Sequence, residues 1–147
     1  MSYFKAILPQ VLSWIEEQKT HPWILLRGDL GAGKTTFTKE LLTELGFDTQ
    51  QIQSPTFLKL LSYKNSKSEL ALHMDAYRIE EEREFLRLGL EDYDQIKIGL
   101  VEWPDLFISF LKKYPALRET LEVDKALEIT LPSDHDLSKV LIREFSF

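Results

Sequence analysis

The chain has 147 residues, 44% of them hydrophobic and 29% charged, which is enough for one globular domain with a sizeable core. It has no cysteine, no apolar run near the roughly 20 residues that span a bilayer and no signal-peptide pattern at its start, so we expect a cytoplasmic protein without disulfides. The net charge of −6 disfavours a chain whose own surface is the main contact for nucleic acid.

The first third of the chain predicts a helix, a strand and a second helix. Residues 3–19 place apolar side chains on one helical face, and a His-Pro pair ends this pattern. The apolar run over residues 23–26 is typical of a buried parallel strand. Residues 34–45 combine helix formers with apolar residues at helical spacing, and Gly46 ends that helix.

Between this strand and this helix, residues 28–35 read GDLGAGKT, a complete Walker A phosphate-binding loop. Its glycines allow a sharp turn that brings N–H groups against phosphate oxygens, and the helix N-terminus adds unpaired donors and partial positive charge. Lys34 is expected to reach the β- and γ-phosphates, and Thr35 to offer its hydroxyl to Mg²⁺. The alternative, a glycine-rich turn that binds nothing, is disfavoured because a strand precedes the loop and a helix follows it.

The rest of the chain predicts strands and helices in alternation. Strands are expected over residues 56–63, 69–74, 96–101, 126–131 and 139–147, and helices over 80–88 and 104–114. The last two strands alternate apolar and polar residues, which is typical of half-buried antiparallel strands. These elements predict an α/β fold, a P-loop NTPase three-layer sandwich with a mixed, partly antiparallel sheet, in a single domain over residues 1–147.

Two acidic residues stand at the carboxyl ends of predicted strands, where open α/β sheets bind their ligands. Asp75 follows the strand at 69–74, and Glu102 follows the strand at 96–101. A P-loop site needs a carboxylate that holds Mg²⁺ or its waters and a group that orients the attacking water. Asp75 and Glu102 are the candidates for these two tasks, and the sequence leaves their division open. Taken singly, either acid could instead be a helix N-cap or a surface ion pair.

Other residues near these positions carry weaker signals. Thr56, in an SPT segment, could turn its hydroxyl toward the γ-phosphate or Mg²⁺, or belong to a plain turn. His73 lacks the further ligands of a zinc site, so a packed or hydrogen-bonded histidine is expected. Arg78 is expected in a structural ion pair, with stabilisation of charge on the transferred phosphoryl group as the alternative, and Trp103 is expected in the core. The acidic segment 80–94 is expected to be a solvated helix face, with a partner-docking surface as the alternative.

Five segments resemble, in the same order, the TsaE (YjeE) family of bacterial ATPases that serve the threonylcarbamoyladenosine modification of transfer RNA: GDLGAGKTTF, SPTF, HMDAYR, GLEDY and VEWP. The resemblance spans residues 23–104. Many families share a Walker A loop, but its combination with SPT, H-x-D-x-Y-R and VEW is highly specific. The resemblance implies a small P-loop α/β ATPase domain with ATP and Mg²⁺ as cofactors.

The resemblance also implies roles for particular residues. Thr35 would lie on Mg²⁺, Asp75 would be the Walker B-type acid, and Glu102 a second essential acid near Mg²⁺ and the attacking water. Lys139 could take the place of a basic residue near the nucleotide, where the family more usually has arginine. Lys34, Asp75 and Glu102 would form the catalytic set. The nucleotide-binding set would be Gly28, Gly31, Ala32, Gly33, Lys34, Thr35, Thr36, Thr56, Asp75 and Lys139.

Three functions follow from these observations. The first hypothesis is a Mg²⁺-dependent ATPase that drives a partner complex, which the resemblance identifies as the threonylcarbamoyl transferase TsaD and its companion TsaB, with transfer RNA contacted mainly by those partners. A small P-loop metabolite kinase is the second, although the chain has little room for a lid and a second-substrate domain. A nucleotide-dependent adaptor without significant turnover is the third. No N-K-x-D motif is present, which disfavours a GTPase, and ATP as the nucleotide comes from the resemblance.

Overall fold

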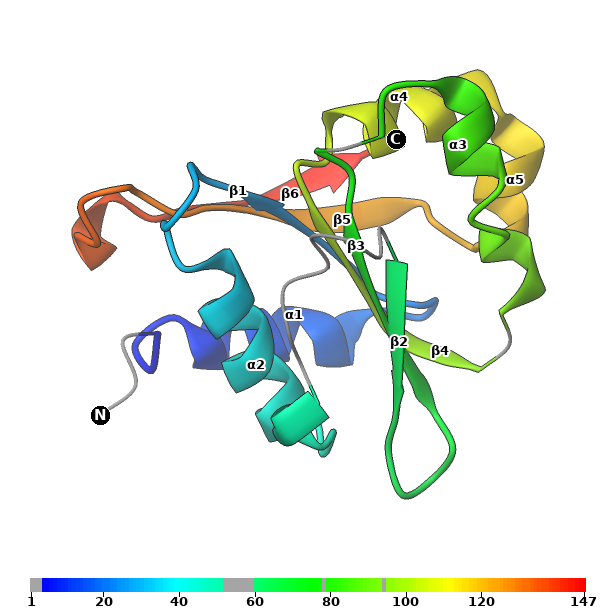
Figure 1. Ribbon diagram of the computed structural model, residues 1–147. Coiled ribbons are helices and arrows are strands. Elements are labelled where there is room, and N and C mark those ends of the chain that lie inside the picture. The colour runs from blue at the N-terminus through cyan, green and yellow to red at the C-terminus, as the bar shows by residue number, and fades with distance from the viewer. Residues whose placement is uncertain (1–3, 52–59, 78, 94) are drawn as a thin grey trace.

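One six-stranded mixed sheet forms the centre of the molecule in the computed structural model, which describes residues 4–51, 60–77, 79–93 and 95–147 (Figure 1). Its strands are β1 Trp23–Arg27, β2 Leu60–Lys64, β3 Leu70–Asp75, β4 Ile96–Glu102, β5 Lys125–Thr130 and β6 Leu141–Ser146. Their order across the sheet is β2-β3-β4-β1-β5-β6. The four inner strands run parallel, whereas β2 and β6 pair antiparallel at the two edges, which confirms the predicted mixed sheet.

Helices cover both faces of this sheet and complete the three predicted layers (Figure 1). The α-helices are α1 Leu8–Glu17, α2 Lys34–Glu44, α3 Glu82–Leu86, α4 Asp105–Lys113 and α5 Pro115–Thr120, and three short 3₁₀ turns are η1 Thr49–Gln51, η2 Leu90–Asp92 and η3 Leu137–Lys139. Helices α1 and α2 pack on one face, and α3, α4 and α5 on the other. Within the described residues, no helix is long and apolar enough to cross a membrane.

The first four residues of strand β1 are all apolar, because the strand is covered by helices on both faces. Side chains alternate between the two faces of a strand. Ile24 and Leu26 join the core beneath α1 and α2, while Trp23 and Leu25 join the core beneath α4. All four are fully buried, because both faces of this central strand are covered by helices.

The pairing of β1 with β4 depends on a close contact between Trp23 and Gly99. These two residues are Cα partners in the parallel ladder. A Cβ atom at position 99 would lie 2.3 Å from Cε3 of the Trp23 ring, so only glycine leaves room for this tryptophan. The ring packs in turn on Phe107 of α4, with centroids 5.1 Å apart. The same register places Leu26 beside Glu102, which brings the end of β1 next to the acid at the end of β4.

Within the described residues, three predicted elements have a boundary that differs from the structure by two residues or more. Helix α1 begins at Leu8 rather than at residue 3, with a proline in its first turn, where the missing N–H donor is tolerated. The helix predicted over 80–88 is only the five residues of α3, because the chain is still extended at Glu81. Strand β6 begins at Leu141, since the preceding residues form η3, and Lys139 therefore lies outside the strand that was predicted to contain it.

Two further expectations about the C-terminal half were wrong or incomplete. Helix α5 was not predicted; it begins at Pro115, which cannot continue α4 because it has no N–H donor but is well suited to a first turn. Strand β5 was expected to be half-buried, yet its residues 126–129 are all buried. It lies between β1 and β6 and packs on both faces, so the half-exposed member of the antiparallel pair is the edge strand β6.

Candidate functional site

The loop between β1 and α2 folds as the Walker A pattern predicts, and two of its glycines are sterically required. Gly33 stands before the first residue of α2 with a left-handed φ of 101°, and a Cβ there would lie 3.0 Å from Cζ of Phe4. A Cβ on Gly28 would lie 2.9 Å from the carbonyl oxygen of Leu131. The loop is therefore pressed against the core, and its far side is open at Gly31, where a Cβ would meet nothing within 4 Å.

Lys34 opens α2 and turns its side chain back over this loop. Its Nζ donates to the carbonyl oxygens of Gly28 and Asp29, the latter at 3.2 Å. The ammonium also lies 4.2 Å from the centroid of the Trp103 ring, within range of a cation–π contact. Burial lowers the pKa of Lys34, and the nearby carboxylate of Glu102 opposes this shift. The Lys34 ammonium thus donates to two loop carbonyl oxygens, and phosphate oxygens could take their place as acceptors.

The two predicted acids lie side by side at the carboxyl ends of β3 and β4. Asp75 and Glu102 are Cα partners in the parallel ladder. Both lie on the sheet face that carries α2, since Ala71 and Leu100, which share their faces of the pleat, pack in the core beneath that helix. Exposure of the two residues is only 7% and 4%. Strand-end acids predicted separately from the sequence therefore form one pair.

The environments of the two carboxylates differ. Burial raises the pKa of Asp75, and the N–H of Tyr77, which donates to its Oδ1 at 2.9 Å, opposes this shift. Glu102 accepts a 2.6 Å hydrogen bond at Oε2 from Nε2 of His73, which is fully buried. The expectation of a hydrogen-bonded His73 is confirmed. Asp75 accepts from a local turn rather than capping a helix, and no hydrogen bond from the described residues is found at its Oδ2.

Lys34, Asp75 and Glu102 converge on one cavity of about 280 Å³ in front of the N-terminus of α2. Seven predicted site residues line it: Gly31, Gly33, Lys34, Thr35, Thr36, Asp75 and Glu102. Leu30 and Trp103 complete the lining. Trp103 was expected in the core, and this was wrong: it is only half-buried at the cavity rim, and its ring contacts that of Tyr77, with centroids 4.8 Å apart. The sequence signal that could have placed Trp103 at the cavity is its position directly after Glu102.

The remaining predicted residues lie elsewhere. Gly28 lines a neighbouring cavity of about 330 Å³ on the other side of Trp103. The side chain of Ala32 is buried in the core, and its N–H donates to the carbonyl of Asp29. Lys139 pairs with Asp134 beside η3. Thr56 and Arg78 lie outside the described residues, so their predicted roles stay predictions.

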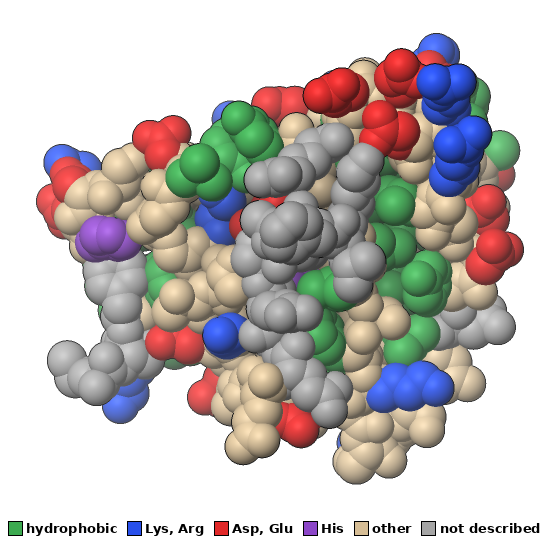
Figure 2. Space-filling view, in the orientation of Figure 1, with side chains coloured by type: hydrophobic (Ala, Val, Ile, Leu, Met, Phe, Trp, Pro, Cys, Tyr) green, Lys and Arg blue, Asp and Glu red, His purple; other side chains and the backbone are tan. Residues whose placement is uncertain are grey.

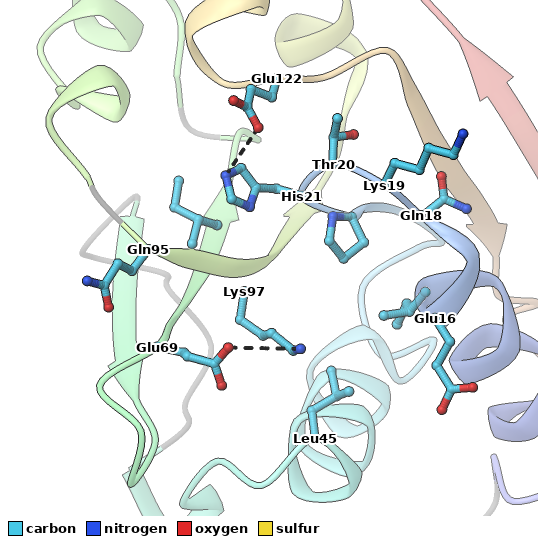
Figure 3. Close-up of a pocket in the computed structure, with 13 residues that line it drawn as sticks. Glu16, Gln18, Lys19, Thr20, His21, Leu45, Glu69, Gln95, Lys97 and Glu122 are labelled. Carbon is cyan, nitrogen blue, oxygen red and sulfur yellow. Dashed lines mark ion pairs between the residues drawn. The ribbon is translucent and has the colours of Figure 1, made fainter.

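A larger cavity, about 690 Å³, lies at the opposite end of the parallel strands, by their amino ends (Figure 3). Its lining comes from the C-terminal ends of α1 and α2, the start of β4 and the segments that precede β1, β3, β4 and β5. It includes the ion pairs His21–Glu122 and Lys97–Glu69, at 3.6 and 3.9 Å. Among the described residues that line it, none belongs to a glycine-rich loop or to a helix N-terminus. Size alone would select this cavity, whereas the chemistry of the lining selects the smaller one.

The acidic segment forms a charged surface around α3, where acidic and basic side chains are interleaved (Figure 2). Glu81 pairs with Arg83 at 2.6 Å, and Glu82 pairs with Lys113 of α4 at 2.7 Å. Charges that are paired along an exposed helix are what a solvated face requires. This geometry favours the solvated face over the docking surface.

The polar groups around the cavity fit a nucleoside triphosphate with Mg²⁺. No group of three or more acidic, histidine or cysteine side chains that could hold a metal alone is found among the described residues. Mg²⁺ is usually held by one or two carboxylates together with substrate phosphates and waters, and this site offers two buried carboxylates and the Thr35 hydroxyl beside a helix N-terminus. Burial and the neighbouring carboxylate of Glu102 raise the pKa of Asp75, and a cation bound there would favour its ionised form.

A P-loop between a parallel strand and a helix, with two acids on the neighbouring strands of a mixed sheet, defines an α/β protein of the P-loop NTPase class. The family described as "Threonylcarbamoyl adenosine biosynthesis protein TsaE" matches residues 5–136. The chain belongs to this TsaE family.

Individual relatives bear the same description. The tRNA threonylcarbamoyladenosine biosynthesis protein TsaE of Rickettsia felis is 37% identical over 105 residues, which cover 71% of this chain and 60% of that protein. The Haemophilus influenzae protein of the same name is 33% identical over 124 residues, covering 84% and 77%. The chain thus spans less than two thirds of the Rickettsia protein. A solved structure titled "Crystal structure of Bacillus subtilus YdiB" is 30% identical with a TM-score of 0.48, covering 80% of this chain and 64% of that one.

Proposed function

We propose that this chain is a Mg²⁺-dependent ATPase that supports the threonylcarbamoyladenosine modification of transfer RNA. The observation that carries the proposal is the convergence of Lys34, Asp75 and Glu102 on one cavity at the N-terminus of α2. Membership of the TsaE family supplies the pathway. The P-loop supplies the phosphate chemistry.

Each residue has a task that its position supports. The free N–H groups at the start of α2 would bind phosphate oxygens, and Lys34 would leave the loop carbonyls to bind the β- and γ-phosphates. Thr35 and Asp75 would hold Mg²⁺ directly or through its waters. Mg²⁺ supplies charge neutralisation between the phosphates when it is bound. Glu102 would orient the attacking water and accept its proton.

We further propose that the chain acts with partner proteins in the cytoplasm. The partners would be proteins similar to TsaD and TsaB, and transfer RNA would be contacted mainly through them, which fits a net charge of −6. ATP hydrolysis would then drive a cycle of that complex. A cytoplasmic location and a single ATPase domain over residues 1–147 belong to the same proposal.

Phosphate release tests the proposal most directly. The assay measures inorganic phosphate from ATP and Mg²⁺, for the chain alone and with its TsaB and TsaD partners. Because removal of one electrostatic or acid–base group typically slows an enzyme by about 100-fold or more, Lys34→Ala and Glu102→Ala should each fall at least that far while staying folded. Lys97→Ala is the matched control, since Lys97 lies near the amino end of β4, away from the nucleotide cavity (Figure 3). Wild-type turnover by either site variant would refute the assignment.

The same assay separates the other two functions. A metabolite kinase would transfer the phosphoryl group to a small molecule and release little free phosphate. A nucleotide-dependent adaptor would bind ATP and its partners and release almost none, even in the full complex. A modification assay with partners and transfer RNA then tests the pathway: equal product over many turnovers with wild type and Lys34→Ala would remove this chain from the cycle.

A further inference from the structure

The contact between His73 and Glu102 joins two buried polar side chains from neighbouring strands. The two residues are 29 positions apart in the sequence, and their side chains meet because β3 and β4 are paired in parallel. Nε2 of His73 and Oε2 of Glu102 are 2.6 Å apart, and the side chains are 0% and 5% exposed. A carboxylate only accepts, so the imidazole donates from Nε2. The contact occupies one oxygen of Glu102, and no hydrogen bond from the described residues is found at the other.

Nothing else in the described surroundings explains a histidine at this position. In the register of the sheet, His73 stands between Leu61 of β2 and Leu100 of β4. Its Nδ1 is buried and has no hydrogen-bond partner among the described residues. A buried nitrogen without a partner destabilises the fold, and an apolar side chain of similar size would avoid this cost. The bond to Glu102 is therefore the polar contact that this histidine provides.

Full burial also defines how His73 can act. A side chain with no exposed surface cannot touch ATP or the attacking water, so His73 would act through a neighbouring side chain, and Glu102 is the one to which it is hydrogen-bonded. The terminal torsion of a glutamate is soft and allows the carboxylate to turn over a wide range. A short hydrogen bond to one oxygen restricts that rotation. It therefore sets where the second oxygen lies relative to the cavity.

We propose that His73 is the positioning residue for Glu102: it holds the carboxylate so that its free oxygen faces the attacking water. This inference rests on the proposed ATPase function. Outer partners that orient a reacting carboxylate typically contribute about 10- to 100-fold to activity or to metal affinity. Loss of the contact should lower kcat by that factor, and KM for ATP should change by less than about threefold, since the phosphate-binding loop is untouched.

The test compares three substitutions at one position. His73→Leu fills the space but removes the donor, His73→Gln keeps an amide N–H near the place of Nε2, and His73→Asn keeps an amide that is too short to reach Glu102. We expect His73→Leu and His73→Asn to lose about 10- to 100-fold in kcat and His73→Gln to recover most of that loss. Circular dichroism verifies folding. If His73→Leu is unfolded, the comparison of the asparagine and glutamine variants decides the outcome.

A double-mutant cycle separates positioning from a general structural effect. In a Glu102→Gln background the carboxylate is already gone, so adding His73→Leu should change the residual rate by less than about twofold. The matched control is His21→Leu, the same exchange in the segment before β1, at the amino ends of the strands (Figure 3). We expect wild-type turnover from this variant. A full additional loss in the Glu102→Gln background would show that His73 acts independently of Glu102 and would overturn the inference.

The result that sinks this inference differs from the one that sinks the ATPase proposal. If wild type releases phosphate and Lys34→Ala does not, the ATPase proposal holds. Wild-type kcat in His73→Leu or His73→Asn would then refute the positioning role alone. If Lys34→Ala is as active as wild type, the ATPase assignment fails first, and the role of His73 fails with it.

Discussion

Gly99 faces Trp23 across the β1–β4 pair, and its replacement by alanine tests whether this contact sets the centre of the sheet. The added Cβ would lie 2.3, 2.4 and 2.7 Å from three atoms of the Trp23 ring. Carbon atoms in contact normally lie about 3.5–4.0 Å apart, so the overlap is about 1 Å. The ring has no exposed surface and packs on Phe107, so it cannot move aside without disturbing α4.

The expected loss of stability follows from two opposing effects. Overpacking of this kind destabilises by about 1–3 kcal/mol, and the size of the overlap places Gly99→Ala near the upper end. Alanine also restricts the unfolded chain, which returns about 0.5–1 kcal/mol. The net loss is about 2 kcal/mol, which for a chain of this size lowers Tm by roughly 4–8 °C.

Thermal unfolding followed by circular dichroism measures this effect, and the double variant with Trp23→Leu provides the decisive control. Leucine leaves the space that the alanine methyl would enter, so Gly99→Ala should cost little in the Trp23→Leu background. The coupling free energy between the two positions should therefore be about 2 kcal/mol. Additive effects within about 0.5 kcal/mol, or an unchanged Tm in Gly99→Ala, would refute the reasoning.

Two predictions concern the site itself. Burial raises the pKa of Asp75, so the folded chain resists the loss of this proton and the ionised side chain lowers stability above the unfolded pKa near 3.8. Asp75→Asn should therefore raise the Tm of the nucleotide-free chain by a few degrees at pH 7 and not at pH 3.5, in melts at both pH values; an equal gain at both would contradict the burial argument. Saturating ATP and Mg²⁺, at about 100 times Kd, should stabilise the wild-type chain by about 2.7 kcal/mol in a thermal-shift experiment. The Lys34→Ala variant should show little of this gain, and an equal shift would place the nucleotide elsewhere.

Sequence patterns predicted the parts of the site that depend on local chemistry. The Walker A loop requires glycines, a lysine and a hydroxyl at fixed spacing, and the strand before it and the helix after it are visible as an apolar run and a helical periodicity. Asp75 and Glu102 were identified because acids directly after apolar strands are local features. Element boundaries were predicted less well: helix α5 was missed, although Pro115 is a local signal for the first turn of a helix.

A P-loop α/β chain with two candidate acids is predictable from the sequence alone, because each of these signals lies within a single element. The pairing of the two acids needs tertiary structure, because β3 and β4 have to be neighbours in the sheet. Their position at the P-loop requires β4 to pair with β1 as well, and this order does not follow the chain. Strand order is set by long-range packing such as that of Trp23 over Gly99. The pairing of β3 with β4 also joins His73 to Glu102 across 29 residues, and this contact has no local signature in the sequence.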